Sequence, residues 1–366
     1  MALKIEPRPG IEGLVPYDPG KPIEETQREL GLERVIKLAS NENPLGPSPK
    51  AVEALREAIG EINRYPDGGC YYLKRRLADK LGVPPESLIF GNGSNELIEL
   101  LFRTFVMDGE RVVYGYPAFV VYRLISQAMG IEGISVPLKG MVHDLEAMAQ
   151  AASEGVRVVF VANPNNPTGT MVTHQQVMEF INSVPEDVIL VFDEAYYEFV
   201  PPARGFPELV PALLDMERPI VVMRTFSKLY GLAGVRIGYG VARPELIELM
   251  NRVRQPFNVN SLAQVAALAA LDDEEHVVRS QRLVWEEMVF LEDSLSAMGL
   301  ETVPSVANFL LVKVGDGNKV FQGLLRRGVI VRAMGGYGLH QYIRVTIGTR
   351  EENEIFLEAL KAVLGL

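Results

Sequence analysis

The chain has 366 residues, and 36 lysines and arginines stand against 47 aspartates and glutamates, a formal net charge of −11. This length corresponds to about two domains, and 48% hydrophobic with 23% charged residues is typical of globular proteins, not of disordered or coiled-coil chains. The excess of acidic residues argues against nucleic acid or an anionic membrane as a partner, because polyanions select lysine and arginine.

The single cysteine and the first residues indicate the cellular compartment. Cys70 has no second cysteine with which to form a disulfide within the chain, which fits a reducing environment. Residues 1–20 lack the basic and apolar sections of a secretory signal, and no apolar run reaches the roughly 18 residues of a membrane span. We therefore expect a cytoplasmic protein with no membrane partner.

The chain begins with a segment rich in proline. Residues 7–22 include five prolines, and each proline fixes its φ angle and lacks an N–H donor. This composition predicts an extended segment, and we assign residues 1–35 to an N-terminal arm.

From residue 88 onward, short apolar runs alternate with amphipathic stretches. Runs rich in Val and Ile without polar alternation are typical of strands buried on both faces. The alternation predicts right-handed β-α-β crossovers and a mainly parallel sheet covered by helices, an α/β fold. The predicted strands are 88–90, 111–114, 133–136, 157–162, 188–192, 220–224 and 236–241, with helices at 96–107, 118–129, 144–152 and 175–182.

The C-terminal part mixes helices with strands, which is typical of a smaller α+β domain. We therefore expect a large domain over residues 36–260 and a small domain over residues 261–366. The predicted elements that follow residues 244–254 are a helical region from 261 to about 298, strands at 308–313, 329–332 and 342–347, and a helix at 351–364.

Polar residues, glycine and proline gather at the ends of predicted strands, where ligands bind in open α/β sheets. Gly91-Asn92-Gly93-Ser94-Asn95-Glu96 joins a strand to a helix. Its small residues let backbone N–H groups approach an anion, and the helix N-terminus adds a partial positive charge. The spacing matches neither a P-loop nor a dinucleotide fingerprint. By itself, a glycine turn with a helix cap explains this segment better.

Two further strand ends carry polar side chains. The loop Asn163-Pro164-Asn165-Asn166-Pro167-Thr168-Gly169 is rigid enough to hold an asparagine amide in one orientation, although a plain turn explains it equally well. Asp193 follows a predicted buried strand, where a carboxylate is costly to ionise without a cationic partner. A surface aspartate in a turn is the alternative.

The last of these segments is Thr225-Phe226-Ser227-Lys228, at the end of another predicted strand. A lysine beside two hydroxyls is placed to form a Schiff base if its pKa is depressed. Arg236, eight residues on, is within reach of the same phosphate as Ser227. A solvated surface lysine is the ordinary alternative.

In this order the segments resemble the fold-type-I pyridoxal-phosphate aminotransferases, and more closely their histidinol-phosphate branch. The resemblance runs from about residue 15 to residue 350. It implies an aspartate-aminotransferase-like large domain, a smaller C-terminal domain, an N-terminal arm and pyridoxal 5'-phosphate as the cofactor. The motifs that carry it are Pro16-Tyr17, Leu38-Ala39-Ser40-Asn41-Glu42-Asn43-Pro44, Asn63-Arg64-Tyr65-Pro66-Asp67-Gly68, Thr225 to Lys228 with Gly234-Val235-Arg236, Asn258-Val259-Asn260-Ser261, and Ile343-Arg344-Val345-Thr346-Ile347-Gly348.

The resemblance assigns catalytic roles to three residues. Lys228 matches the lysine that holds the cofactor as a Schiff base and then moves the substrate's proton. Asp193 matches the carboxylate that pairs with the ring nitrogen and so keeps the ring an electron sink. Tyr196, together with Asn166, matches the residues that hydrogen-bond the ring's phenolic oxygen.

The other implied cofactor contacts surround the phosphate and the ring. Two depart from the family's pattern: position 119 is Phe where relatives more often carry Tyr, and position 95 is Asn where many carry Asp. The implied contacts are Gly93, Ser94, Asn95, Thr225, Ser227 and Arg236 at the phosphate, Phe119 stacked on the ring, and Tyr65 reaching the neighbouring subunit's phosphate in a homodimer.

The resemblance also implies substrate contacts. Arg344 matches the arginine that grips the α-carboxylate of the amino donor, and Arg332, Tyr17 and Asn43 are the further expected contacts. Two arginines accept either a carboxylate or a phosphate ester, so one site serves both glutamate and histidinol phosphate in turn. A surface arginine is the alternative for Arg332.

The implied activity is a transaminase that interconverts histidinol phosphate plus 2-oxoglutarate and imidazole-acetol phosphate plus glutamate in histidine biosynthesis. Its partners would be a small amino donor and a phosphorylated keto acceptor. Alternatives are an aromatic amino-acid aminotransferase, a pyridoxal-phosphate decarboxylase of an O-phospho amino acid, and a transaminase-like regulatory domain, for which the arm before Tyr17 is too short to hold a DNA-binding module. No metal site is expected, because the four histidines have no ligand spacing.

Overall fold

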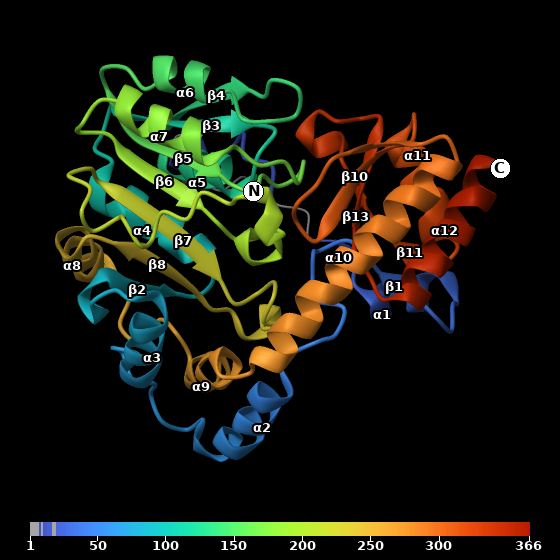
Figure 1. The fold of residues 1–366 in the computed structure, drawn as a ribbon, viewed down its shortest axis with the longest axis horizontal. Helices are drawn as coiled ribbons and strands as arrows, with labels where there is room; N and C mark the ends of the chain where they lie inside the picture. The colour runs from blue at the N-terminus through green and yellow to red at the C-terminus, as the bar shows by residue number, and fades with distance from the viewer. Residues whose placement is uncertain (1–6, 9, 17–19) are drawn as a thin grey trace, which may run out of the picture.

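The computed structural model describes residues 7–8, 10–16 and 20–366. They form a larger and a smaller lobe joined by a long helix, as Figure 1 shows. The larger lobe contains a seven-stranded sheet, and the smaller lobe contains a four-stranded antiparallel sheet. The α/β architecture expected from the sequence is confirmed.

The seven-stranded sheet has the order β2-β8-β7-β6-β5-β3-β4. Its strands run parallel from β7 to β4, whereas β8 is antiparallel to both of its neighbours. Every residue of β6 and β7 is buried, which explains why these strands read as continuous apolar runs. The strands are β2 (Leu88–Gly91), β3 (Arg111–Tyr116), β4 (Glu132–Pro137), β5 (Val156–Ala162), β6 (Ile189–Asp193), β7 (Ile220–Thr225) and β8 (Gly238–Ala242).

Five helices connect or cover these strands. α4 buries Leu97, Ile98 and Leu101 completely. It begins at Ser94, two residues before the predicted start, because Gly93 takes a φ of 78° and ends the preceding turn. The helices are α4 (Ser94–Phe105), α5 (Val121–Met129), α6 (Leu145–Ala151), α7 (His174–Ser183) and α8 (Pro244–Val253).

The region predicted as helical from 261 to 298 is two helices, α9 (Ser261–Leu271) and α10 (Glu274–Ala297). The break falls at Asp273, whose side chain accepts a hydrogen bond from the backbone N–H of His276 and so caps α10. α9 packs on α2 (Pro49–Ala58) and α3 (Tyr71–Leu81). α10 then runs from the larger lobe into the smaller one (Figure 1).

The smaller lobe is built on a sheet of order β12-β13-β10-β9. The predicted strand 329–332 is two short strands in different sheets, because β11 pairs with β1 while β12 pairs with β13. α11 and α12 pack against each other. The elements are β9 (Glu301–Val303), β10 (Phe309–Lys313), α11 (Gly317–Leu325), β11 (Val329–Ile330), β12 (Arg332–Ala333), β13 (Tyr342–Thr346) and α12 (Arg350–Leu364).

The N-terminal region contributes to this lobe as well. Ile23–Leu30 forms helix α1 within the segment expected to be an arm, and it ends at Gly31 with a φ of 66°. Strand β1 (Ile36–Lys37) lies parallel to β11, although residue 36 was the first residue of the predicted large domain. The division at residues 35 and 260 stays a prediction.

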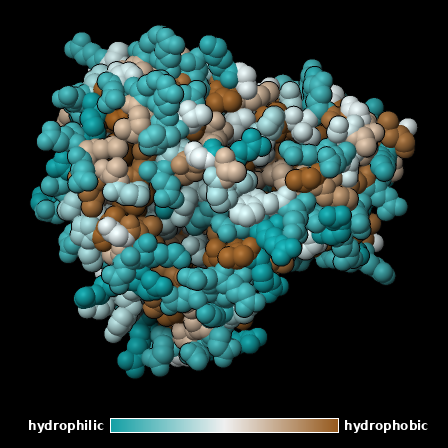
Figure 2. Space-filling view, in the orientation of Figure 1, coloured by the Kyte–Doolittle hydropathy of each residue, from teal (hydrophilic) through white to brown (hydrophobic). Residues whose placement is uncertain are grey.

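Short 3-10 helices complete the fold, and the visible surface is mainly hydrophilic with scattered apolar residues (Figure 2). Within the described ranges, no helix combines the length and apolar character that crossing a membrane requires. The 3-10 helices are η1 (Ile59–Glu61), η2 (Pro85–Ser87), η3 (Tyr197–Phe199), η4 (Pro202–Arg204), η5 (Ala233–Val235) and η6 (Gly335–Tyr337).

Candidate active site

A cavity of about 800 Å³ lies where the ends of β5, β6 and β7 meet the N-terminus of α4, and β13 and residues 40–41 contribute to its wall. Parallel strands bring their carboxyl ends to one edge of a sheet, so residues distant in sequence converge there. Eleven residues singled out in the sequence line this cavity: Ser94, Asn95, Phe119, Asn166, Asp193, Tyr196, Thr225, Ser227, Lys228, Arg236 and Arg344.

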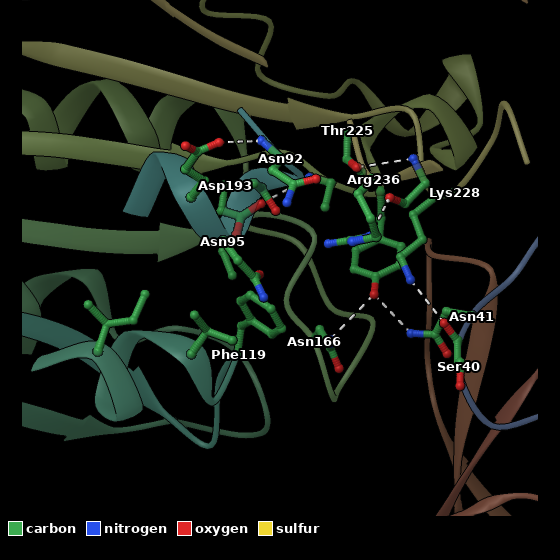
Figure 3. Close-up of a pocket in the computed structure, with 18 of the residues that line it drawn as sticks. Ser40, Asn41, Asn92, Asn95, Phe119, Asn166, Asp193, Thr225, Lys228 and Arg236 are labelled. Carbon is green, nitrogen blue, oxygen red and sulfur yellow. Dashed lines mark hydrogen bonds between the residues drawn. The ribbon is translucent and has the colours of Figure 1, made fainter. Parts of the chain in front are cut away.

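Lys228 lies just after β7 and lines the cavity. Its Nζ donates a hydrogen bond to the backbone carbonyl of Ser40 at 2.9 Å, as Figure 3 shows. Burial, and next the positive charge of Arg344, lower the pKa of Lys228 from 10.5 to about 7. A large fraction of this amine is therefore neutral and nucleophilic near neutral pH.

Asp193 is the last residue of β6 and is buried. Its Oδ2 accepts a hydrogen bond from the Tyr122 hydroxyl at 2.7 Å, and its Oδ1 accepts one from the backbone N–H of Ala195 at 3.3 Å. Burial raises the pKa of Asp193, and these hydrogen bonds oppose the rise. The sequence analysis expected a cationic partner for this carboxylate. The side chain that donates to Oδ2 is instead the neutral tyrosine Tyr122.

Four side chains form a connected chain of hydrogen bonds across the cavity. The Tyr196 hydroxyl accepts from Nδ2 of Asn41 at 2.9 Å and from Nδ2 of Asn166 at 3.3 Å (Figure 3). Oδ1 of Asn166 accepts from Nη1 of Arg344 at 2.5 Å. Burial raises the pKa of Tyr196 to about 12, so this phenol stays protonated at neutral pH.

The opposite part of the cavity is suited to an anion. Gly93 has no side chain, and a Cβ at this position would lie 2.3 Å from Nη2 of Arg236. Ser94 starts helix α4 at the same place, so unpaired backbone N–H groups and the helix dipole favour negative charge there. Nη1 of Arg236 donates to Oγ of Ser227 at 3.4 Å, and Thr225 lies beside them in the wall.

Arg332 and Asn43, two residues predicted to contact substrate, lie outside this cavity. Arg332 lines an adjacent cavity of about 990 Å³ that shares Tyr337 with the first. Asn43 donates through Nδ2 to the backbone carbonyl of Leu229 at 2.6 Å and to Oγ of Ser280 at 2.9 Å. Its side chain therefore joins the Lys228 segment to α10, whereas Asn41 faces the cavity.

Tyr65 and Tyr17 complete the set of predicted residues. Tyr65 is 84% exposed and stacks on Phe257 with a ring separation of 4.9 Å. It is not in the wall of this cavity, and its contact with a neighbouring subunit stays a prediction. Tyr17 lies outside the described residues.

A buried ion pair beneath the site was not anticipated from the sequence. Nε and Nη2 of Arg224 both lie 2.8 Å from Oε2 of Glu194, and the guanidinium stands 3.6 Å from the centre of the Tyr197 ring. Side chains alternate along strands, so this pair lies behind its neighbours Asp193 and Thr225. It ties the ends of β6 and β7 together. The signal in the sequence was a Glu and an Arg next to two predicted site residues.

Comparison with known proteins places the chain in a family. The family model described as aminotransferase class I and II matches residues 33–360. Histidinol-phosphate aminotransferase of Moorella thermoacetica is 51% identical over 98% of this chain and 93% of its own, and histidinol-phosphate aminotransferase 1 of Nitrosococcus oceani is 49% identical over 97% and 96%.

A solved structure has the same fold. Histidinol-phosphate aminotransferase from Sinorhizobium meliloti, in complex with pyridoxal-5'-phosphate, superimposes with a TM-score of 0.90. It is 28% identical and covers 100% of this chain and 98% of its own. The protein described here belongs to the aminotransferase class I and II family.

Proposed function

We propose that this protein is a pyridoxal-phosphate-dependent transaminase that interconverts histidinol phosphate plus 2-oxoglutarate and imidazole-acetol phosphate plus glutamate in histidine biosynthesis. Relatives about half identical over nearly the whole chain carry the name histidinol-phosphate aminotransferase. The observation that carries the proposal is the placement of Lys228, with its pKa lowered to about 7, in one cavity with Asp193 and an anion cradle.

The residues present fit this cofactor. The space that Gly93 leaves beside Arg236, with Ser94, Thr225 and Ser227, suits its phosphate. Lys228 suits its aldehyde, because the amine has a lowered pKa. Opposite these groups, the amide of Asn166 and the hydroxyl of Tyr196 suit the phenolic oxygen, and the carboxylate of Asp193 suits the ring N–H.

The cofactor, when bound, supplies an electron sink for the negative charge that develops at the substrate's α-carbon. Asp193 holds the proton on the ring nitrogen by offering its carboxylate. Lys228, as a free amine near neutral pH, takes the proton from the substrate's α-carbon and later returns one. Tyr196 and Asn166 would hold the ring by hydrogen bonds to its phenolic oxygen.

Arg344 is the proposed anchor for the substrate's anion. Its guanidinium is buried at the cavity wall, donates to Asn166 and, through Nη2, to the backbone carbonyl of Ala39 at 2.8 Å. A guanidinium binds a carboxylate or a phosphate through two parallel hydrogen bonds, so glutamate and histidinol phosphate are both accommodated. Arg332 in the adjacent cavity, Asn43 and Tyr17 stay predicted contacts.

We also propose that the protein is a homodimer of the cytoplasm. Large apolar and aromatic side chains are exposed around α2 and α3, which is unusual for a surface that stays in water. Tyr65 belongs to this group, and its exposure supports the proposal that it contacts a second copy. Light scattering of the purified protein tests the dimer, and a monomer mass at micromolar concentration would contradict it. The exposed residues are Ile59, Ile62, Tyr65, Tyr71, Tyr72 and Phe257.

The activity is tested by incubating the purified protein and cofactor with histidinol phosphate and 2-oxoglutarate and measuring glutamate. Glutamate should accumulate in proportion to enzyme, and the Lys228→Ala variant should produce none above background. If carbon dioxide is released from an O-phospho amino acid and no glutamate forms, the decarboxylase alternative is correct.

A further inference from the structure

Tyr122, a residue on α5, makes a direct hydrogen bond to Asp193 from outside the cavity wall. Its side chain is completely buried, and its hydroxyl lies 2.7 Å from Oδ2 of Asp193. The two residues are 71 positions apart in the sequence and come from different elements. Among the described residues, Tyr122 does not line the cavity wall, so its hydroxyl acts on the site through Asp193.

The ring of Tyr122 is fixed by three aromatic neighbours. It stacks on Phe160 with a centroid separation of 4.7 Å and an angle of 16°, and it meets the edge of Phe119 at 5.6 Å and 86°. Tyr114 lies 6.5 Å away. Such packing leaves the ring little rotational freedom, so the hydroxyl is aimed permanently at Asp193.

The hydrogen bond changes the proton affinity of the carboxylate. A donor to a carboxylate stabilises its ionised form and makes it a weaker base. The other charged or titratable groups that act on Asp193 are Lys228, Tyr196 and the neighbouring Glu194. Lys228, with a pKa of about 7, carries only part of a positive charge near neutral pH. Among the groups that lower the pKa of Asp193 against the effect of burial, the Tyr122 hydroxyl has the largest effect, ahead of the Ala195 N–H and Lys228.

We propose that Tyr122 is a positioning residue of the transaminase: its hydroxyl holds Asp193 through Oδ2 and leaves the carboxylate able to accept the cofactor's ring N–H. The inference rests on the role proposed for Asp193. A carboxylate has about four acceptor positions, so the bonds from Tyr122 and Ala195 leave capacity for the ring N–H. Because Tyr122 weakens the base, the proton between Asp193 and the ring stays on the ring nitrogen.

The test compares the holoenzyme with its Tyr122→Phe variant, loaded with cofactor that carries ¹⁵N in the ring. We expect the ¹⁵N signal of Tyr122→Phe at pH 7.5 to move toward the position of unprotonated pyridine. We also expect kcat to fall about 10- to 100-fold, which is the loss of one hydrogen bond to a charged group. KM for the substrate should change less than about threefold, because Tyr122 contacts no substrate.

Tyr114→Phe is the matched control, because Tyr114 belongs to the same aromatic cluster and its hydroxyl lies against Gly133 and not against Asp193. It should keep the wild-type ¹⁵N signal and kcat. Incorporation of fluorotyrosine at position 122 makes a stronger donor of the same shape. It should move the ¹⁵N signal away from the unprotonated position, which tests the proposal even if Tyr122→Phe folds poorly.

Asp193→Asn separates this inference from the proposed function. If Asp193→Asn moves the ¹⁵N signal and Tyr122→Phe does not, the inference about Tyr122 is wrong and the proposed function stands. The inference is equally wrong if Tyr122→Phe loses activity with an unchanged signal, since the role is then structural only. If Asp193→Asn changes neither the signal nor kcat, the role proposed for Asp193 itself is wrong.

Discussion

Nζ of Lys228 donates to the backbone carbonyl of Ser40 at 2.9 Å, although the two residues are 188 positions apart in the sequence. The next residue, Asn41, donates to the Tyr196 hydroxyl and has a left-handed φ of 56°. The N-terminal segment between the two lobes therefore forms a wall of the cavity and holds the lysine. We expect the reactive amine and the cofactor-facing phenol to depend on this segment.

Replacing Lys228 by Ala removes both the attachment point and the base. We expect kcat to fall on the order of 10³-fold or more, and the cofactor to be lost on dialysis, because nothing covalent retains it. Lys313→Ala is a suitable control, since Lys313, the last residue of β10, is partly exposed, pairs with Glu301 of β9 and does not line the cavity. Wild-type turnover by Lys228→Ala would show that another residue is the base.

The lowered pKa of Lys228 predicts a pH dependence. Only the neutral amine attacks the cofactor, and the amine is protonated below its pKa of about 7. The rate at which cofactor-free protein takes up pyridoxal phosphate should therefore fall about tenfold for each pH unit below 7 and level off above it. Stopped-flow absorbance gives this profile, and a midpoint near 10 would contradict the burial argument. Arg344→Gln should raise the midpoint, because the Arg344 charge lowers the pKa.

We expect the affinity for both substrates to depend on the guanidinium of Arg344. In Arg344→Lys the planar pair of donors becomes a single ammonium, so bidentate binding of a carboxylate or phosphate is lost. We expect KM for both glutamate and histidinol phosphate to rise about tenfold or more, with a smaller effect on kcat. Arg326→Lys, at an exposed position, should leave both constants unchanged. A KM change for only one of the two substrates would show that they use different anchors.

We expect the buried ion pair of Glu194 and Arg224 to stabilise the folded protein. Glu194→Gln leaves the Arg224 charge without its partner, and we expect the free energy of unfolding to fall by about 3–5 kcal/mol in urea titrations. Glu248→Gln removes the partner of Arg252 in an exposed pair, and the loss should stay under about 1 kcal/mol. Equal losses in the two variants would mean that the buried pair does not hold β6 to β7.

Removing both charges refines that experiment. A double variant, Glu194→Leu with Arg224→Met, leaves no buried charge unpaired, and well-packed apolar pairs are often as stable as the ion pair that they replace. We expect most of the stability lost in Glu194→Gln to return. If the double variant has a lower free energy of unfolding than Glu194→Gln, the pair stabilises the fold through its packing and hydrogen-bond geometry, and not through charge compensation.

Much of the fold was predictable because its strands are buried on both faces. β5, β6 and β7 are apolar except at Arg157, at Asp193 and at Arg224 with Thr225, so their positions followed from hydrophobic runs. Short edge elements were not predictable: β9 has three residues that are exposed or partly exposed, and the split of 329–332 depends on pairing with β1, almost 300 positions earlier. The hydrophobic pattern of a short segment does not show which distant strand it pairs with.

The cavity was predictable where its residues follow strands directly, as Asp193 and Lys228 do. Tyr122 and Asn41 were missed, because their partners lie 71 and 155 positions away. The motif around Asn41 and Asn43 also did not indicate which asparagine faces the cavity. The turn at Asn41, with its positive φ, points that residue inward and sends Asn43 toward α10.

The most direct test of the account is a comparison of amine half-reactions at fixed pH, with histidinol phosphate, phenylalanine and tyrosine supplied in turn to the cofactor-loaded enzyme. The account predicts the highest kcat/KM for histidinol phosphate, because Arg344 and the basic residues of the adjacent cavity suit a phosphate ester. A higher kcat/KM for phenylalanine or tyrosine would contradict it and identify the protein as an aromatic amino-acid aminotransferase on the same scaffold.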